Sequence, residues 1–136
     1  MLALAPPGHE RWRVGVPVGD DGAVENTSGD LLAALPGPLP DELVELLVDT
    51  PGFRVERIVS TGQASLPGSW YDQSEHEFVL LVSGAARLAW SDGTEQVLLS
   101  GQWTWIPAHV RHRVAWTDPS QATVWLAVFV EAERAG

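Results

Sequence analysis

The chain of 136 residues is long enough for one hydrophobic core and too short for two cores of ordinary size. Apolar residues make up 45% of the chain and charged residues 19%, a balance that excludes global disorder. The formal net charge of -10 argues against nucleic acid as a partner, because an acidic protein repels a phosphate backbone. The chain has no cysteine, so any metal would need histidine and carboxylate ligands.

No segment has the roughly 18 consecutive apolar residues that a membrane span needs. Residues 1–7 lack the basic flank and the apolar stretch of a signal peptide. We therefore expect a cytoplasmic protein with no membrane partner.

The first 52 residues are predicted to lie outside the main fold. Residues 1–30, rich in Gly, Pro and Asp, are predicted to form an arm with at most one strand, at 12–16. Residues 31–52 are predicted to be a Pro-rich connector followed by a short helix. Leucines at 43, 46 and 47 share one helical face, and prolines at 40 and 51 bracket the segment.

Residues 53–130 have the texture of an antiparallel barrel or sandwich. Short runs rich in Val, Leu, Trp and Thr are separated by Gly, Pro and Asp every 8 to 12 residues. Asp92-Gly93 predicts a tight hairpin, and Gly84 predicts another turn. The run 122–130 is apolar almost throughout, so it should be covered on one side by the barrel and on the other by the helix or a second subunit. The predicted strands are 53–60, 64–72, 76–83, 85–90, 95–99, 103–106, 111–116 and 122–130.

Acidic and histidine side chains cluster on or beside these strands. Side chains alternate along a strand, so a Glu77 that faces the interior places Val79 and Leu81 inside with it. His76 then points outward unless a bulge turns it. Asp72, near the end of the preceding strand, is placed to close a site around Glu77.

A later strand brings a second candidate to the interior. His112 and Trp116 share one face of this strand, and Arg111 and Arg113 share the opposite face. A buried His112 that meets Glu77 across the barrel would supply half of a metal site. The alternative is that both are ordinary hydrogen-bonded residues of a β-protein.

The spacing of glycine, proline and these two residues resembles the cupin family. Glu77 and Gly84, with six residues between them, match the end of the first cupin motif. Gly101, five residues, Pro107, four residues and His112 match the second motif. The resemblance covers about residues 53 to 130, and residues 70–81 look like a subgroup of small single-domain bacterial cupins.

The resemblance implies an all-β double-stranded β-helix, or jelly roll, that is often a dimer. It also implies a divalent metal ion at the centre of the barrel, with Zn, Fe, Mn and Ni all left open. The first motif of the family normally supplies two histidines shortly before the glutamate. Here those places hold Trp70 and Asp72, or Tyr71 and Gln73, and His109 stands where the second motif has glycine.

The resemblance therefore carries over only part of the ligand set. Glu77 and His112 are the matched metal ligands, and Asp72 is a substitute at a ligand position. His76 and His109 are additional candidate ligands if local bends aim them inward. Glu77 and His109 are also the candidate catalytic groups for proton transfer.

Other side chains near these residues are predicted to recognise the substrate. Aromatic faces suit flat or sugar-like ligands, and arginines either bind a carboxylate or form surface ion pairs. The remaining tryptophans, at 90, 103, 105 and 125, are expected in the core or in a dimer interface. The predicted substrate-binding residues are Trp70, Tyr71, Gln73, Arg111 and Trp116.

Three functions follow from this site. A cation with open coordination positions can polarise a carbonyl, which predicts metal-assisted isomerase, epimerase or lyase chemistry on a small oxygenated or sugar-like compound. The first alternative is a relic site that binds or senses a ligand or metal without turnover. The second alternative is a cupin dioxygenase, provided that His76 or His109 is a ligand.

A homodimer is expected with any of these functions, through the N-terminal arm and the last apolar strand.

Overall fold

Nine β-strands make up the regular structure of the described residues. The computed structural model describes residues 12–13 and 26–133, and these form strands and loops with no helix. None of them could therefore cross a membrane as a helix. The strands are β1 (Trp12–Arg13), β2 (Leu43–Thr50), β3 (Phe53–Ser60), β4 (Glu75–Ser83), β5 (Ala85–Trp90), β6 (Glu95–Leu99), β7 (Trp103–Ile106), β8 (His112–Thr117) and β9 (Thr123–Glu131).

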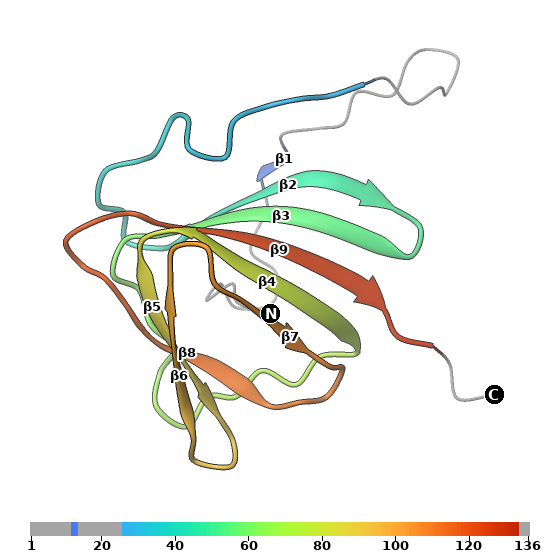
Figure 1. Cartoon of the computed structure of the whole chain (residues 1–136), viewed down its shortest axis with the longest axis vertical. Coiled ribbons are helices and arrows are strands. Elements are labelled where there is room, and N and C mark those ends of the chain that lie inside the picture. The colour runs from blue at the N-terminus through green and yellow to red at the C-terminus, as the bar shows by residue number, and fades with distance from the viewer. Residues whose placement is uncertain (1–11, 14–25, 134–136) are drawn as a thin grey trace.

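The strands form two sheets that share one core. The larger sheet has six strands in the order β1-β2-β3-β9-β4-β7, and the smaller has three in the order β6-β5-β8. In Figure 1 the larger sheet runs across the upper part of the molecule, and the smaller sheet lies below it on the left. Every pairing is antiparallel except that of β1 with β2.

The core lies between the inner faces of the sheets. Alternate residues of each strand point into it, as the period of two requires. Trp125 is fully buried, and its indole Nε1 donates a hydrogen bond to Ser60 Oγ at 3.1 Å. The core consists of Val44, Ile58, Val79, Leu81, Ala86, Leu88, Leu98, Ile106, Val114, Trp125, Ala127 and Phe129.

The predicted helix at 41–48 is wrong, because this segment is strand β2. It pairs with β3 along its whole length, from Leu43 opposite Val59 to Thr50 opposite Phe53. Pro51-Gly52 closes this hairpin and does not end a helix, and Gly52 has the positive φ of 96° that such a turn needs. Apolar residues lie on both faces of the segment, so the spacing of its leucines also fits a helix.

The predicted strand at 64–72 also differs from the structure. This segment is a loop, and only Tyr71 makes an isolated bridge, to His112. Of the strand predicted at 12–16, residues 12 and 13 form β1, and the rest lies outside the described residues, as does most of the predicted arm. The other predicted strands are confirmed to within one residue at each end.

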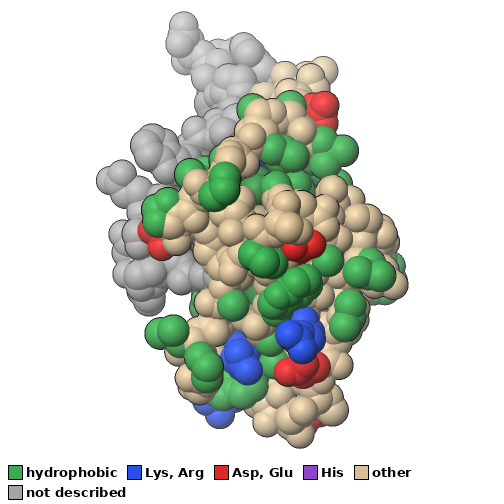
Figure 2. Space-filling view, turned by 90° about the vertical axis from the view of Figure 1, so that its left-hand side faces the viewer, with side chains coloured by type: hydrophobic (Ala, Val, Ile, Leu, Met, Phe, Trp, Pro, Cys, Tyr) green, Lys and Arg blue, Asp and Glu red, His purple; other side chains and the backbone are tan. Residues whose placement is uncertain are grey.

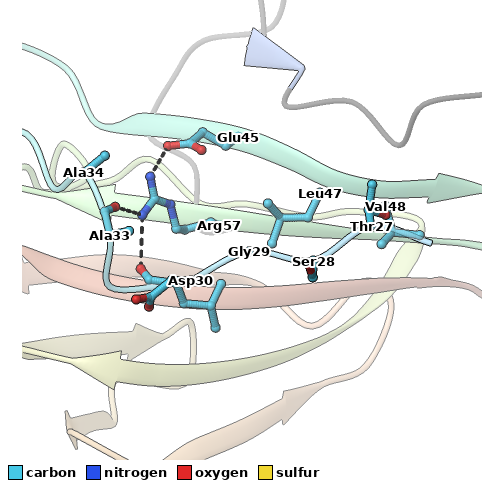
Figure 3. A pocket seen from close by; sticks show the side chains of 11 residues that line it. Thr27, Ser28, Gly29, Asp30, Ala33, Ala34, Glu45, Leu47, Val48 and Arg57 are labelled. Carbon is cyan, nitrogen blue, oxygen red and sulfur yellow. Dashed lines mark hydrogen bonds and ion pairs between the residues drawn. The ribbon is translucent and has the colours of Figure 1, made fainter. Parts of the chain in front are cut away.

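Hydrogen bonds from Arg57 hold the connector, residues 31–42, against the outer face of the larger sheet. The guanidinium of Arg57 donates hydrogen bonds to the carbonyl oxygens of Leu31 and Ala33, at 3.1 and 2.7 Å, and binds Glu45. Figure 3 shows these contacts at one end of a pocket of about 440 Å³ between residues 27–34 and strands β2 and β3. This pocket lies outside the barrel, on the face opposite the core.

Candidate functional site

Glu77 of β4 and His112 of β8 face each other inside the barrel. Both side chains are fully buried, and Nε2 of His112 lies 3.9 Å from Oε1 of Glu77. Glu77 points inward because it alternates with Val79 and Leu81, which are core residues. The two sheets thus each contribute one polar group to the same point of the interior, as predicted from the sequence.

Two hydrogen bonds orient this pair. The side-chain amide of Gln73 donates to Oε1 of Glu77 at 3.0 Å. Nδ1 of His112 lies 2.9 Å from the carbonyl oxygen of Val110. A carbonyl oxygen can only accept, so Nδ1 carries the proton, and in the neutral ring Nε2 is an acceptor directed at Glu77.

Burial keeps His112 neutral. Loss of solvent lowers the pKa of its imidazole, and the hydrogen bond to Val110 and the nearby Glu77 only partly oppose this effect. Near neutral pH the interior therefore presents a neutral imidazole nitrogen beside a carboxyl oxygen. Such a pair can accept hydrogen bonds or a proton from a bound molecule.

Two aromatic rings form the walls around His112. The ring centroids of Tyr71 and Trp90 lie 5.9 and 6.1 Å from that of His112. Burial, followed by the charges of Glu42 and Glu77, raises the pKa of Tyr71 to about 12, against a hydrogen bond from Ser65. Tyr71 is therefore a protonated phenol that can donate a hydrogen bond.

Asp72 and His109 form a separate pair on the surface. Nδ1 of His109 lies 2.7 Å from Oδ1 of Asp72, and both side chains are exposed. The backbone N–H of His109 donates to the carbonyl oxygen of Gln73 at 2.8 Å, which joins this pair to the segment that supports Glu77. His109 has a φ of 65°, in the left-handed region where glycine is favoured.

His76 faces away from the interior. Its Nδ1 accepts a hydrogen bond from the backbone N–H of Ala108 at 2.9 Å, and its ring centroid lies 5.3 Å from that of Trp105. Trp105 is exposed on the outer side of β7. No bulge turns His76 inward, so it follows the alternation that points Glu77 to the core.

The residues present do not fit a metal centre with three or more ligands. The five predicted ligands occupy three places: the buried pair Glu77–His112, the surface pair Asp72–His109, and His76 on the outer face. Within residues 26–133, no three histidine or carboxylate side chains gather so that they could hold a metal ion. The dioxygenase alternative needed His76 or His109 beside Glu77, and neither lies there.

Three of the predicted substrate-binding residues lie outside the barrel. A bulge between Val114 and Trp116 shifts the register of β8, so that Trp116 pairs with Arg87 and its ring points outward. Trp70 also lies on the outer side of the smaller sheet, where the guanidinium of Arg113 is 5.6 Å from the centre of the Trp70 ring. Arg111 is exposed. Tyr71 and Gln73 are the two members of the set at the interior site.

The structure adds charged groups that the sequence analysis missed. Glu56 is fully buried on the inner face of β3, and the guanidinium of Arg54 binds both Glu56 and Glu75. Arg54 also lies 4.1 Å above the ring of Phe129, which is opposite Glu77 in the sheet. The signal was present, because Arg54, Glu56 and the core residue Ile58 share one face at a period of two.

Fold and site together define a two-sheet β-barrel that holds a polar pair in its interior. The sequence matches no protein-family model and no curated protein. Solved structures do resemble it. A protein from Ralstonia eutropha described as a "putative mannose-6-phosphate isomerase" is 45% identical, with a TM-score of 0.76, over 79% of this chain and 100% of that chain.

More distant structures share the fold. A cupin superfamily protein from Desulfitobacterium hafniense has 14% identity and a TM-score of 0.64, over 79% of this chain and 94% of that one. An RmlC-like cupin with a double-stranded β-helix from Methanocaldococcus jannaschii has 17% identity and a TM-score of 0.61, over 81% and 94%. The chain belongs to the same family as the Ralstonia eutropha protein and has the cupin fold, and the predicted double-stranded β-helix is confirmed.

Proposed function

We propose that this cupin binds a small oxygenated, sugar-like compound inside its barrel and moves a proton on it, as an isomerase or epimerase does. The observation that carries the proposal is the buried pair of acceptors, Nε2 of His112 and Oε1 of Glu77, at 3.9 Å. The pair suits a compound that brings hydroxyl groups and an acidic C–H bond. The name of the Ralstonia eutropha protein, which is 45% identical, points to the same class of reaction.

In this proposal His112 is the base. Its neutral Nε2 takes a proton from the carbon next to a carbonyl group, the C–H electron pair forms a C=C bond, and the carbonyl π pair moves to oxygen. Tyr71 donates a hydrogen bond to that oxygen, and Glu77 relays the hydroxyl proton between the two oxygens. Return of the proton to the neighbouring carbon gives isomerisation. Epimerisation at the same carbon requires the enediol to turn over in the site, so that His112 returns the proton to its opposite face.

The charges of the interior favour an uncharged substrate over a phosphate ester. Among the residues that the structure describes, Arg54 is the arginine on the inner face of the larger sheet, and it already binds Glu56 and Glu75. A phosphate group would have to displace one of these carboxylates and would also meet the acidic Glu77. A neutral sugar needs no such exchange, because its hydroxyl groups can donate to the acceptors.

The proposal uses no metal ion, because Glu77 and His112 are the two of the five predicted ligands that lie at the interior site. Metal analysis of protein purified without an affinity tag tests this point. We expect a content far below one ion per chain. A near-stoichiometric metal that is lost in His112→Ala would restore the metal-assisted mechanism.

The second candidate function is binding without turnover, as a ligand-sensing module. The observation that favours it is the close packing of Tyr71 and Trp90 around His112, which leaves the site walled by aromatic rings. In that case the same polar pair would recognise hydroxyl groups and transfer no proton.

Proton exchange on defined sugars separates the two candidates. The protein is incubated in D₂O with D-mannose, D-glucose, D-fructose and the 6-phosphates of all three, and deuterium at the carbon next to the carbonyl is followed by ¹H NMR. We expect exchange on an uncharged sugar, reduced about a hundredfold or more in His112→Gln. The matched control His76→Gln makes the same change at a histidine of β4 that faces away from the interior, and it should retain exchange.

Each other result has a definite meaning. Sugars that raise the thermal midpoint without exchange would select the binding module. Exchange confined to the phosphates would refute the uncharged substrate, and equal loss in both histidine variants would refute the role of His112.

We also propose that the protein is a homodimer that pairs through the outer face of the larger sheet. Leu126 and Val128 of β9 lie there half-buried beside Phe78 of β4, and Trp103 of β7 is exposed. The predicted helix that was to cover this face is a strand of the sheet itself. We therefore expect a second subunit to cover this face of β9.

A further inference from the structure

The outer face of the smaller sheet carries a basic and apolar surface made of residues that do not reach the barrel interior. One row across the sheet consists of Val97 of β6, Arg87 of β5 and Trp116 of β8, which are cross-strand neighbours. Val97 and Trp116 are 59% and 36% exposed. The β8 bulge creates this row, because without it Trp116 would point to the core with Val114.

A second row runs beside the first. It consists of Glu95 of β6, Ala89 of β5 and Arg113 of β8. Trp70 lies beside the guanidinium of Arg113, at 5.6 Å from the ring centre, and this cation–π contact holds the arginine in place. A preorganised arginine loses little freedom when it binds a partner.

The arginines of this surface differ from those of the larger sheet. Arg54 and Arg57 are held in ion pairs with buried or half-buried glutamates on the larger sheet. Arg113 has no ion-pair partner within residues 26–133. Arg87 meets Glu95 at 3.4 Å, but both side chains are more than 40% exposed, and such surface pairs contribute little.

The surface is therefore a local exception in an acidic protein with a net charge of -10. Figure 2 shows basic side chains gathered in the lower half of one face, beside hydrophobic side chains and an acidic group. Exposed apolar residues next to cations that are unpaired or only weakly paired are typical of surfaces that bind proteins, where tryptophan and arginine contribute most of the affinity.

We infer that the outer face of the smaller sheet is a docking surface for an acidic peptide segment of a partner protein, with apolar side chains between its carboxylates. The carboxylates pair with Arg87 and Arg113, and the apolar side chains pack on Trp116 and Val97. Nucleic acid fits less well, because the rest of the molecule repels phosphates and this face exposes aliphatic residues. A small anion would leave the apolar row uncovered.

Selection from a random peptide library displayed on phage tests this inference. The wild-type protein is the bait, and the selected peptides are synthesised and their Kd values measured by fluorescence anisotropy at 50 and 500 mM NaCl. We expect the selected sequences to combine Asp or Glu with apolar residues, and their binding to weaken about tenfold or more at the higher salt.

Variants locate the binding site. Arg87→Gln, Arg113→Gln and Trp116→Ser should each weaken binding about tenfold, whereas Trp103→Ser on the larger sheet should leave it unchanged. Thermal midpoints confirm that each variant is folded. Peptides without an excess of acidic residues, or binding that survives the three variants, would overturn the inference. So would capture of single-stranded DNA in place of the peptides, or a selection that enriches no sequence.

Discussion

The burial of His112 and its hydrogen bond to Val110 together determine what its imidazole can do chemically. Its Nδ1 is tied to the Val110 carbonyl oxygen at 2.9 Å, so the ring cannot turn without breaking that bond. In this ring orientation Nε2 is directed toward Glu77. A side chain fixed in this way is preorganised to accept a proton at one atom, as a general base must.

The lowered pKa of His112 predicts how stability depends on pH. Below about pH 6.5 the unfolded chain takes up a proton at this residue and the folded chain does not. Burial thus makes the free energy of unfolding fall as the pH is lowered, by at most about 1.4 kcal/mol per pH unit. Urea unfolding between pH 7.5 and 5.5 should show a steeper decline for the wild type than for His112→Gln. Parallel declines would contradict the assignment.

His109 makes a second prediction at the residue scale. Its φ of 65° costs about 1 kcal/mol for a residue with a side chain and nothing for glycine. Its exposed contact with Asp72 returns less than that. We expect His109→Gly to be as stable as the wild type or more so, and His109→Ala to be less stable than His109→Gly by about 1 kcal/mol. Urea midpoints measure the order of the three proteins, and an Ala variant more stable than the Gly variant would refute backbone strain.

The candidate site was predictable where simple alternation holds and not where the chain departs from it. Glu77 and His112 were found because each lies on a regular stretch of strand, in register with core residues. Trp116 was placed inside by the same rule, and a single extra residue in β8 turned it outward. Asp72 and His109 lie in loops, where sequence spacing gives no direction for a side chain.

At the scale of elements, the prediction of the strands succeeded where turns are marked by glycine. β5 and β6 were correctly bounded because Asp92-Gly93 and Gly84 punctuate them. The sequence of β2 also fits a helix because apolar residues lie on both of its faces. Its inner face contacts the core, and its outer face is covered by the connector that Arg57 fastens. Both contacts are with residues far away in the chain, which local periodicity does not show.

At Gly84, in the turn between β4 and β5, both the backbone conformation and the packing against Thr123 require glycine. Its φ is 110°, and a Cβ placed there would lie 2.5 Å from Oγ1 and 2.7 Å from Cα of Thr123. Gly93 has a φ of 93° with nothing within 4 Å of such a Cβ, so it is a matched control for backbone strain alone. We expect Gly84→Ala to lose about 2 kcal/mol more of the free energy of unfolding than Gly93→Ala. Equal losses in urea unfolding would mean that the contact with Thr123 relaxes freely.

The whole molecule presents two outer faces of different character. The larger sheet is apolar along β4, β9 and β7, where the rings of Phe78 and Trp103 stack at 5.4 Å between centroids. The smaller sheet mixes arginines with exposed Val97 and Trp116. An antiparallel sheet that faces water usually presents polar residues to it. Both outer faces instead expose apolar groups, and because the two faces differ in charge we expect a different partner to bind each of them.

The proposed assignment, a second copy on the larger sheet and an acidic peptide on the smaller one, is tested by moving the same charge between faces. Trp103 and Val97 are both 59% exposed, one on each sheet. In a symmetric dimer, Trp103→Glu buries two like charges near the two-fold axis or against apolar residues, and should weaken the dimer about a hundredfold or more. Val97→Glu should leave the dimer intact and abolish binding of the acidic peptides by repulsion. Light scattering after gel filtration gives the mass of each variant. A wild-type monomer would refute the dimer, and dissociation by Val97→Glu in place of Trp103→Glu would exchange the roles of the two faces.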